Sequence, residues 1–310
     1  MVGRSMQHRH DHAHDHGSGP GYGLAFALGL LLNLAFVVVE TTYGVIANSV
    51  ALLADAGHNL SDVLALAVAW SASVLVRRRP SHRFTYGLRS SSILAALFNA
   101  IVLLIAVGAI IVEALNHLAA PEPVAGVTVI VVAGIGVVIN AATALLLWGG
   151  RHGELNSRAA FLHMAADTAV SLGVVVAGAL ILLTHWLWLD PATSLVVALV
   201  IVVGAWRLLR DAVNMALDAV PPGIDAAAVR MHLQALRGVV DVHDLHIWPM
   251  STTETALTCH LVMPAGHPGD RVLADLAHAL HERFAIEHAT IQIETGDPDH
   301  PCKLVPDHVV

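Results

Sequence analysis

The sequence predicts an α-helical membrane protein: a bundle of six transmembrane helices followed by a cytoplasmic α+β domain. Hydrophobic residues make up 56% of the 310-residue chain and charged residues only 13%, whereas an ordinary soluble domain has about 25% charged residues. The charges are also unevenly spread. Long apolar runs fill the chain from Gly21 to Leu209, but from Asp211 onward the composition is that of a soluble domain.

Six apolar runs account for the membrane part, which we place at residues 21–211. They fall at residues 24–46, 50–76, 90–116, 124–148, 159–184 and 187–208. Each run has at least the roughly 20 residues that a helix needs to cross the hydrocarbon core of a bilayer. Trp186 and Trp188 lie in the turn THWLWLDP that joins the last two runs, and tryptophan is enriched where helices meet the membrane surface.

The basic residues of the membrane part predict its orientation. Those between Gly21 and Leu209 lie at the ends of the second, fourth and sixth runs or at the starts of the third and fifth: Arg77, Arg78, Arg79, Arg83, Arg89, Arg151, Arg158 and Arg207. Because Lys and Arg favour cytoplasmic loops, we expect the N-terminus and the C-terminal domain in the cytoplasm. We expect the host membrane to be the cell inner (plasma) membrane.

The rest of the chain divides into two tails and one compact domain. Residues 1–20 include the His- and Asp-rich tract HRHDHAHDH, which cannot build a core. We therefore expect a disordered tail that collects metal ions, with a purification tag or solubilising leader as the alternative. Residues 212–296 predict a small sheet with two helices on one face, and residues 297–310 form a C-terminal tail. A domain of this size would gain stability from dimerisation. Its expected elements are a helix at 223–238, strands at 239–248 and 254–263, a helix at 267–284 and a strand at 289–295.

Two polar motifs interrupt the apolar runs with the same spacing. The second run contains His58 and Asp62, and the fifth contains His163 and Asp167. Residues four apart share one face of a helix, about one turn from each other. If the two faces meet, two imidazoles and two carboxylates converge, and this donor set suits tetrahedral Zn²⁺. A hydrogen-bonded pair that only joins two helices is the alternative, but two matched motifs, and the cost of placing a charge in a bilayer, favour a metal site.

Two further acidic residues in the apolar runs leave alternatives open. Asp55 lies three residues before His58, where it could orient that imidazole or line the outer mouth of the bundle. Glu40 in the first run could line a hydrated cavity or bond a neighbouring helix.

Composition and motifs also argue against several function classes. The net charge of −8 and the lack of a basic stripe argue against a nucleic-acid partner. The chain lacks the His-Glu-x-x-His motif and any evident nucleophile–base pair, so we do not expect an enzyme. Cys259 and Cys302 both fall in the expected cytoplasmic part, so we expect no structural disulfide. A metal-gated channel and a membrane metal sensor remain alternatives to a transporter.

Four segments together resemble the cation diffusion facilitator family over about residues 22–295. They are LLNLAFVVVETTYGVIANSVALLADAGHNLSDV, FTYGLRSSSILAALFNA, AAFLHMAADTAVSLGVVVAG and HDLHIWPMSTTETALTCHLVM. Members are homodimeric, proton-coupled exporters of divalent cations with six transmembrane helices and a cytoplasmic ferredoxin-like domain. The resemblance implies that His58, Asp62, His163 and Asp167 hold the transported ion. A His–Asp set of this kind is similar to the zinc-transporting branch, so zinc is the expected substrate, with cadmium, cobalt or nickel as alternatives.

The resemblance also implies metal sites in the cytoplasmic domain, where zinc would act as a regulatory ion. His243, His260 and Glu294 match positions at which relatives bind zinc, and Asp270 stands where some relatives have a His. The tail residues His300 and Cys302 resemble tail ligands of other members.

Two expectations concern neighbouring residues. Strict alternation along the strand would turn His246 and Trp248 away from His243, so that they pack or face a partner. Near the membrane, Arg89 could form an ion pair with Asp211, just beyond the sixth run.

Overall fold

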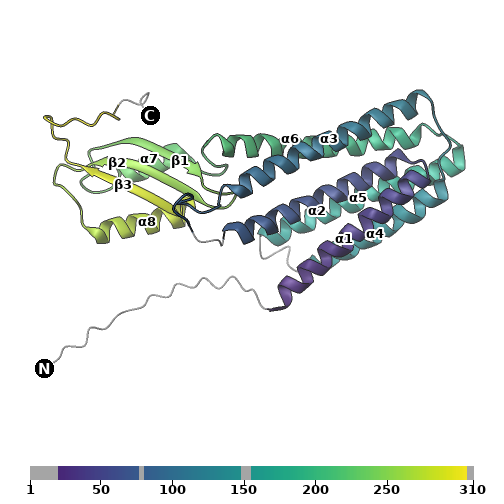
Figure 1. Cartoon of the computed structure of the whole chain (residues 1–310), viewed down its shortest axis with the longest axis horizontal. Coiled ribbons are helices and arrows are strands. Elements are labelled where there is room, and N and C mark those ends of the chain that lie inside the picture. Colours follow the sequence, from purple (N-terminus) through teal and green to yellow (C-terminus); the bar gives the residue numbers. More distant parts are fainter. Residues whose placement is uncertain (1–19, 77–79, 148–154, 306–310) are drawn as a thin grey trace.

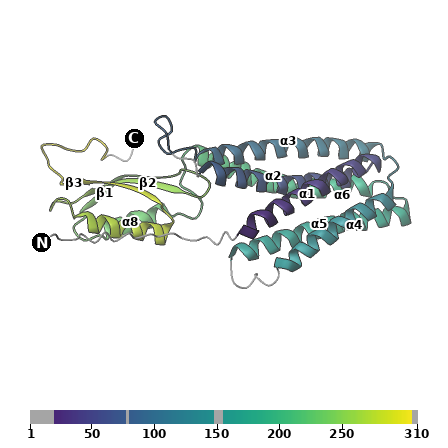
Figure 2. The same ribbon diagram turned by 60° about the horizontal axis from the view of Figure 1, so that its bottom comes forward.

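Six long helices form one bundle in the computed structural model (Figures 1 and 2). The described residues are 20–76, 80–147 and 155–305, apart from some helix side chains, that of His163 among them. The predicted His-rich tail therefore lies almost wholly outside the described residues. The six helices are α1 (Pro20–Ile46), α2 (Val50–Val76), α3 (Ser91–Ala119), α4 (Gly126–Leu147), α5 (Leu155–Thr184) and α6 (Leu189–Ala216).

The helix bounds follow the apolar runs closely, with one clear difference. The sixth run ends at residue 208, but α6 continues to Ala216. Hydropathy marks where the chain leaves the apolar phase, whereas the backbone hydrogen bonds of a helix can continue into water. The last turns of α6, which contain Arg210 and Asp211, carry the chain toward the α+β domain.

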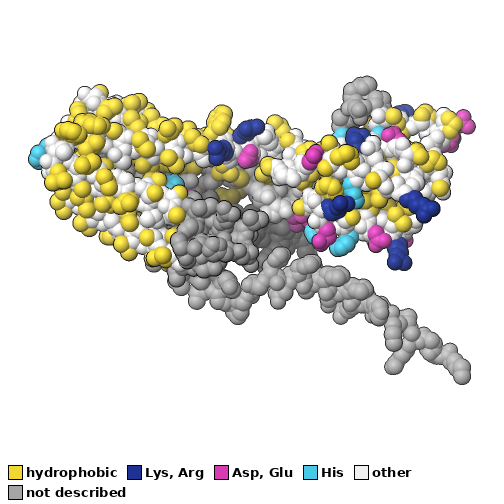
Figure 3. Space-filling model, turned by 180° about the vertical axis from the view of Figure 1, so that it is seen from behind, with side chains coloured by type: hydrophobic (Ala, Val, Ile, Leu, Met, Phe, Trp, Pro, Cys, Tyr) yellow, Lys and Arg dark blue, Asp and Glu magenta, His cyan; other side chains and the backbone are white. Residues whose placement is uncertain are grey.

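The surface of the bundle is apolar, as a lipid-facing surface must be. Phe98, Ile105 and Leu183 are each more than two-thirds exposed, which would be unfavourable in water but is not in lipid. Figure 3 shows hydrophobic side chains over the described bundle, with charged ones gathered mainly on the α+β domain. Within the described residues, α3, α4, α5 and α6 contain segments long and apolar enough to cross a membrane, and residues 33–46 of α1 form a shorter apolar helix.

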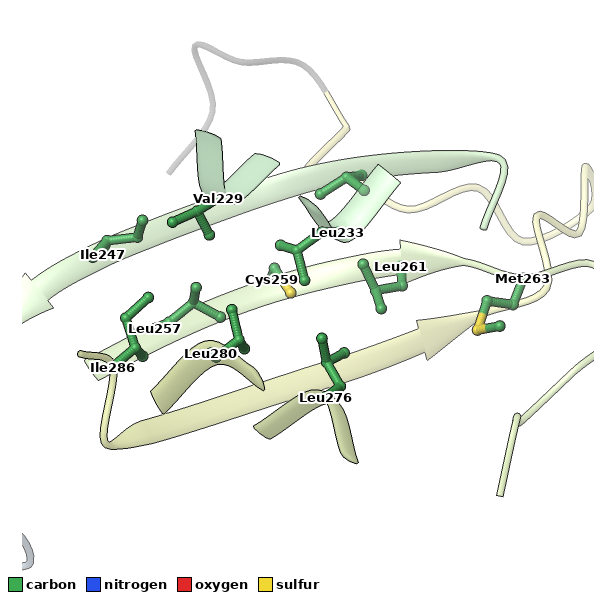
Figure 4. Packing of buried hydrophobic residues seen from close by; sticks show 11 residues of the cluster. Val229, Leu233, Ile247, Leu257, Cys259, Leu261, Met263, Leu276, Leu280 and Ile286 are labelled. Carbon is green, nitrogen blue, oxygen red and sulfur yellow. The ribbon is translucent and has the colours of Figure 1, made fainter. Parts of the chain in front are cut away.

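The predicted order of helices and strands in the α+β domain is confirmed. Its elements are α7 (Ala226–Gln234), β1 (Asp241–Pro249), β2 (Thr255–Val262), α8 (Asp270–Phe284) and β3 (His288–Glu294). The sheet has the order β1-β2-β3, with β2 antiparallel to β1 and parallel to β3. Both helices pack on one face of it, where Leu233 and Leu280 meet Leu257 and Leu261 in a single core (Figure 4).

A β-bulge in β1 makes the simple alternation expected there wrong. His243 pairs with His260, but His246 pairs with Thr258, so three steps along β1 match two along β2. Asp244 occupies the bulge with a φ of 49°, a left-handed conformation that Asp tolerates better than most residues. As a result His246 lies on the same face as His243, the face opposite the helices.

Arg89 connects the bundle to the α+β domain and does not form the expected ion pair with Asp211. Arg89 Nε lies 2.9 Å from Glu254 Oε2, in the turn between β1 and β2, and not against Asp211. The backbone N–H of Thr252, in the same turn, donates to Ser92 Oγ at 3.1 Å. The start of α3 is thus fastened directly to the sheet domain.

The opposite end of the bundle is fixed by Asp190, near the start of α6. Its carboxylate accepts hydrogen bonds from the backbone N–H groups of Val50 at 2.7 Å and Ala51 at 3.3 Å, and from the Ser49 hydroxyl. These groups include free donors of the first turn of α2, so Asp190 caps that helix. The contact sets the position of α2 against α6 at the end of the bundle far from the α+β domain (Figure 1).

Candidate metal centres

One cluster of metal-binding side chains lies inside the helical bundle. His58 Nε2 on α2 lies 2.9 Å from Asp167 Oδ1 on α5. One ligand atom from each of His58, Asp62 and Asp167 lies within 4.8 Å of the others. Asp167 is 2% exposed, so this carboxylate is held away from solvent next to an imidazole. The arrangement offers nitrogen and oxygen donors that converge on one point between two helices.

The predicted fourth ligand, His163, lies in α5 one turn before Asp167, and its side chain is outside the described part. The structure therefore brings together three of the four predicted residues, and the assignment of all four stays a prediction. Zinc takes up such N/O ligands at about 2.0–2.2 Å, so an ion here would replace the direct His58–Asp167 contact with bonds to both.

Asp55 and Glu40 lie next to this cluster, toward the outer end of the bundle. Both are fully buried, so Asp55 does not line an open mouth. Ser171 Oγ on α5 donates to Asp55 Oδ1 at 3.2 Å, and Asn59 Nδ2 on α2 donates to Glu40 Oε2 at 2.8 Å. Glu40 thus bonds a neighbouring helix, which is one of the two roles considered for it.

A second cluster lies on the sheet face that the helices leave uncovered. Ligand atoms of His243, His260, Glu294 and Cys302 all lie within 4.8 Å of one another. His260 Nδ1 is 2.8 Å from Glu294 Oε1 and 3.5 Å from Cys302 Sγ, and His243 Nε2 is 3.3 Å from Glu294 Oε2. The four residues come from β1, β2, β3 and the C-terminal tail.

Strand pairing explains why these side chains meet. His243 on β1 is directly opposite His260 on β2, and Glu294 on β3 pairs with Val262, two residues further along β2. Residues two apart on a strand point to the same face. The tail then brings Cys302 over that face, beside a cavity of about 650 Å³ lined by His243, Glu294, His300 and Cys302.

Two observations indicate that this donor set suits a metal ion. His243 is only 3% exposed, yet its Nδ1 and Nε2 lie 3.4 and 3.3 Å from carboxylate oxygens without making a well-directed hydrogen bond among the described residues. Burial alone would raise the pKa of Glu294, but hydrogen bonds from Cys302 and Gln292 and the neighbouring imidazoles of His243 and His260 outweigh it, so the pKa is lowered. Glu294 is therefore ionised at neutral pH, as a metal ligand must be.

Sequence reasoning missed Asp244 and included two residues that lie outside the cluster. Asp244 Oδ2 is 3.4 Å from His260 Nε2, and Asp244 Oδ1 is 2.8 Å from His246 Nε2. Asp244 was the feature of the sequence that could have indicated a bulge, because Asp tolerates the left-handed conformation better than most residues. Asp270 begins α8 and is exposed, and His300, which is 84% exposed, lies 3.1 Å from Asp297.

Comparison with known protein families gives two matches along the chain. Residues 26–215 match the cation efflux transmembrane domain, and residues 221–296 match the cation efflux protein cytoplasmic domain. Together they include the first cluster and three of the four residues of the second, since Cys302 lies beyond residue 296.

Individual relatives are similar over most of the chain. The metal cation efflux system protein CzcD of Cupriavidus metallidurans is 35% identical, over 88% of this chain and 86% of the relative. The zinc transporter ZitB of Escherichia coli is 37% identical, over 84% and 83% respectively. A cadmium, cobalt and zinc/H⁺-K⁺ antiporter of Bacillus velezensis is 33% identical, over 86% of each chain. Among solved structures, the metal-bound C-terminal domain of CzcD is 40% identical over 23% of this chain and 99% of that domain, with a TM-score of 0.22.

Proposed function

Because the chain belongs to the cation diffusion facilitator family, we propose that it exports zinc from the cytoplasm in exchange for protons. The observation that carries the proposal is the convergence of His58 and Asp62 on α2 with Asp167 on α5 inside the bundle. We include His163 as the fourth ligand, since it stands one turn before Asp167. Six spans, both termini in the cytoplasm, and a homodimer in the cell inner membrane complete the proposal.

The donor set supports zinc over harder ions. Imidazole nitrogen suits zinc, copper, iron and nickel, whereas carboxylate, carbonyl and water oxygens suit magnesium, calcium and manganese. The name of the ZitB relative specifies zinc, and that of the Bacillus relative adds cadmium and cobalt. Cadmium, cobalt and nickel are therefore the competing substrates for this chain.

Proton coupling follows from the chemistry of the ligands. Zinc binds neutral imidazole and ionised carboxylate, so protons and zinc compete for the same atoms. An unperturbed imidazole gains its proton near pH 6.5. If the site opens in turn to the cytoplasm and to a more acidic exterior, protonation outside ejects zinc, and loss of the protons inside restores affinity. Alternating access around a fixed site then makes the cycle an antiport.

Flux measurements in proteoliposomes test this function. Purified protein should move zinc into vesicles toward the acidic side of an imposed pH gradient, faster than without the gradient. A panel of zinc, cadmium, cobalt, nickel and manganese under the same gradient ranks the substrates. Zinc flux that is indifferent to the gradient would leave a facilitator, and no zinc flux at all would remove the transporter assignment.

We propose in addition that zinc binds the second cluster, formed by His243, His260, Glu294 and Cys302, as a regulatory ion. Four N, O and S donors from three strands and the tail match the ligand types of a closed structural zinc site. Zinc bound there would hold the tail against the sheet and supply binding energy to this folded arrangement.

Protection of one thiol tests the second site in the intact protein. The chain has two cysteines. Cys259 is buried, which raises its pKa to about 12, whereas Cys302 is partly exposed, so an alkylating reagent should modify Cys302. Saturating zinc should slow this modification by at least about tenfold, because a metal-bound thiolate is not free to react. His260→Ala should abolish the protection. An alkylation rate that zinc leaves unchanged would contradict the site.

A further inference from the structure

Two buried carboxyl groups inside the bundle have no described role in the proposed site. Glu40 on α1 and Asp55 on α2 are both 0% exposed and lie close enough to interact with each other. One oxygen of each accepts a hydrogen bond, from Asn59 and Ser171 respectively. The other two oxygens, Glu40 Oε1 and Asp55 Oδ2, have no hydrogen-bond partner among the described residues.

The surroundings of the pair do not balance two negative charges. The two hydrogen-bond donors are a neutral amide and a neutral hydroxyl, and α1, α2 and α4 contain no Lys or Arg. The titratable groups that face Asp55 from α2 and α5 are His58 and Asp167, and these already interact with each other. An ionised carboxylate buried without a partner is very costly, and a second beside it more so. A cation must therefore accompany the pair.

We propose that Glu40 and Asp55 form a separate proton site, in which one proton is held between Glu40 Oε1 and Asp55 Oδ2. A proton is the smallest cation that can satisfy two neighbouring carboxyl groups, and the group that keeps it can donate a hydrogen bond to the other. The proposal rests on the proposed function, because it assigns to this pair a share of the protons that the transporter exchanges.

The position of the pair suits a proton that enters from outside. Asp190 places the start of α2 at the end of the bundle far from the α+β domain. Asp55 lies about one turn closer to that end than His58, and Glu40 lies near the same end of α1. Protons from the exterior would therefore reach this pair before the zinc ligands.

Zinc and this proton should exclude each other by charge. Asp55 interacts electrostatically with His58 and Asp167, so a divalent ion bound there stabilises the ionised state of both carboxyl groups. The O–H bond of the pair then breaks, its electrons stay on the carboxylate, and the proton leaves to water. When zinc departs, the pair takes a proton back.

Infrared difference spectroscopy on the full-length protein tests the site. Zinc addition should remove a C=O stretching band of a protonated carboxyl group from the wild-type spectrum, and this change should be absent in Glu40→Gln. Protons released per zinc bound, followed with a pH indicator, should fall by about one in that variant. Glu113→Gln is the matched control, because its carboxyl group is 53% exposed at the outer end of α3 and should change neither measurement.

The possible outcomes distinguish failure of the proton site from failure of the proposed zinc transport. A wild-type protein that transports zinc without a zinc-sensitive carboxyl band overturns the proton site but leaves the transporter intact. A band that persists in both Glu40→Gln and Asp55→Asn assigns the proton elsewhere, and also overturns it. A band that appears only when potassium is removed identifies an alkali cation in place of the proton. The wild-type spectrum alone can contradict the proposal, so the test remains valid even if either variant folds poorly.

Discussion

Replacing Asp167 with alanine is expected to abolish zinc transport in proteoliposomes. The Asp167 carboxylate is buried and lies 2.9 Å from the imidazole of His58. Its removal deletes one zinc ligand and also the contact between Asp167 and the His58 imidazole. Loss of groups that only orient ligands costs about 10–100-fold in metal affinity, and loss of a ligand should cost at least the upper end of that range. Asp62→Ala should behave in the same way.

The control for this experiment is Glu113→Ala, which removes an exposed carboxylate of the membrane domain. It should keep near wild-type flux. Each variant should elute as the wild type does in size-exclusion chromatography, since neither Asp62 nor Asp167 belongs to the α+β core. Normal zinc flux in either ligand variant would remove these residues from the transport site.

Exchange of His58 for aspartate is expected to change which ions are carried. The substitution converts a mixed nitrogen and oxygen donor set toward one made largely of oxygen, and oxygen-rich sites favour harder ions such as manganese. The ratio of manganese to zinc flux should rise by about tenfold or more. A ratio is independent of the amount of protein inserted in the vesicles. Unchanged ratios across the ion panel would show that His58 does not set selectivity.

Much of the fold was predictable because each feature has a local cause. Apolar runs of sufficient length located the helices, and the repeated His-x-x-x-Asp spacing placed His58 and Asp62 on one face opposite Asp167. Alternation in the soluble part located three strands whose core face, with Leu257 and Leu261, packs against two helices.

The features that were missed depend on contacts between distant segments. One bulge at Asp244 shifts the register of β1, and strict alternation therefore assigned His246 to the wrong face. Arg89 pairs with Glu254 because the turn between β1 and β2 meets the start of α3, which no local pattern encodes. The pairing of Glu40 with Asp55 likewise depends on how α1 packs against α2.

Competition between protons and zinc at the membrane site is the central claim, and the zinc affinity of one variant as a function of pH tests it most directly. Removal of residues 1–18, combined with His260→Ala and Cys302→Ser, deletes the His-rich tail and two donors of the cytoplasmic cluster. The remaining tight binding then reports on His58, Asp62, Asp167 and the proposed His163. Between about pH 8 and about pH 5.5 the affinity should fall, by at least about tenfold per pH unit below the ordinary imidazole pKa of about 6.5. An affinity that stays constant across that range would contradict competition, and with it the antiport mechanism.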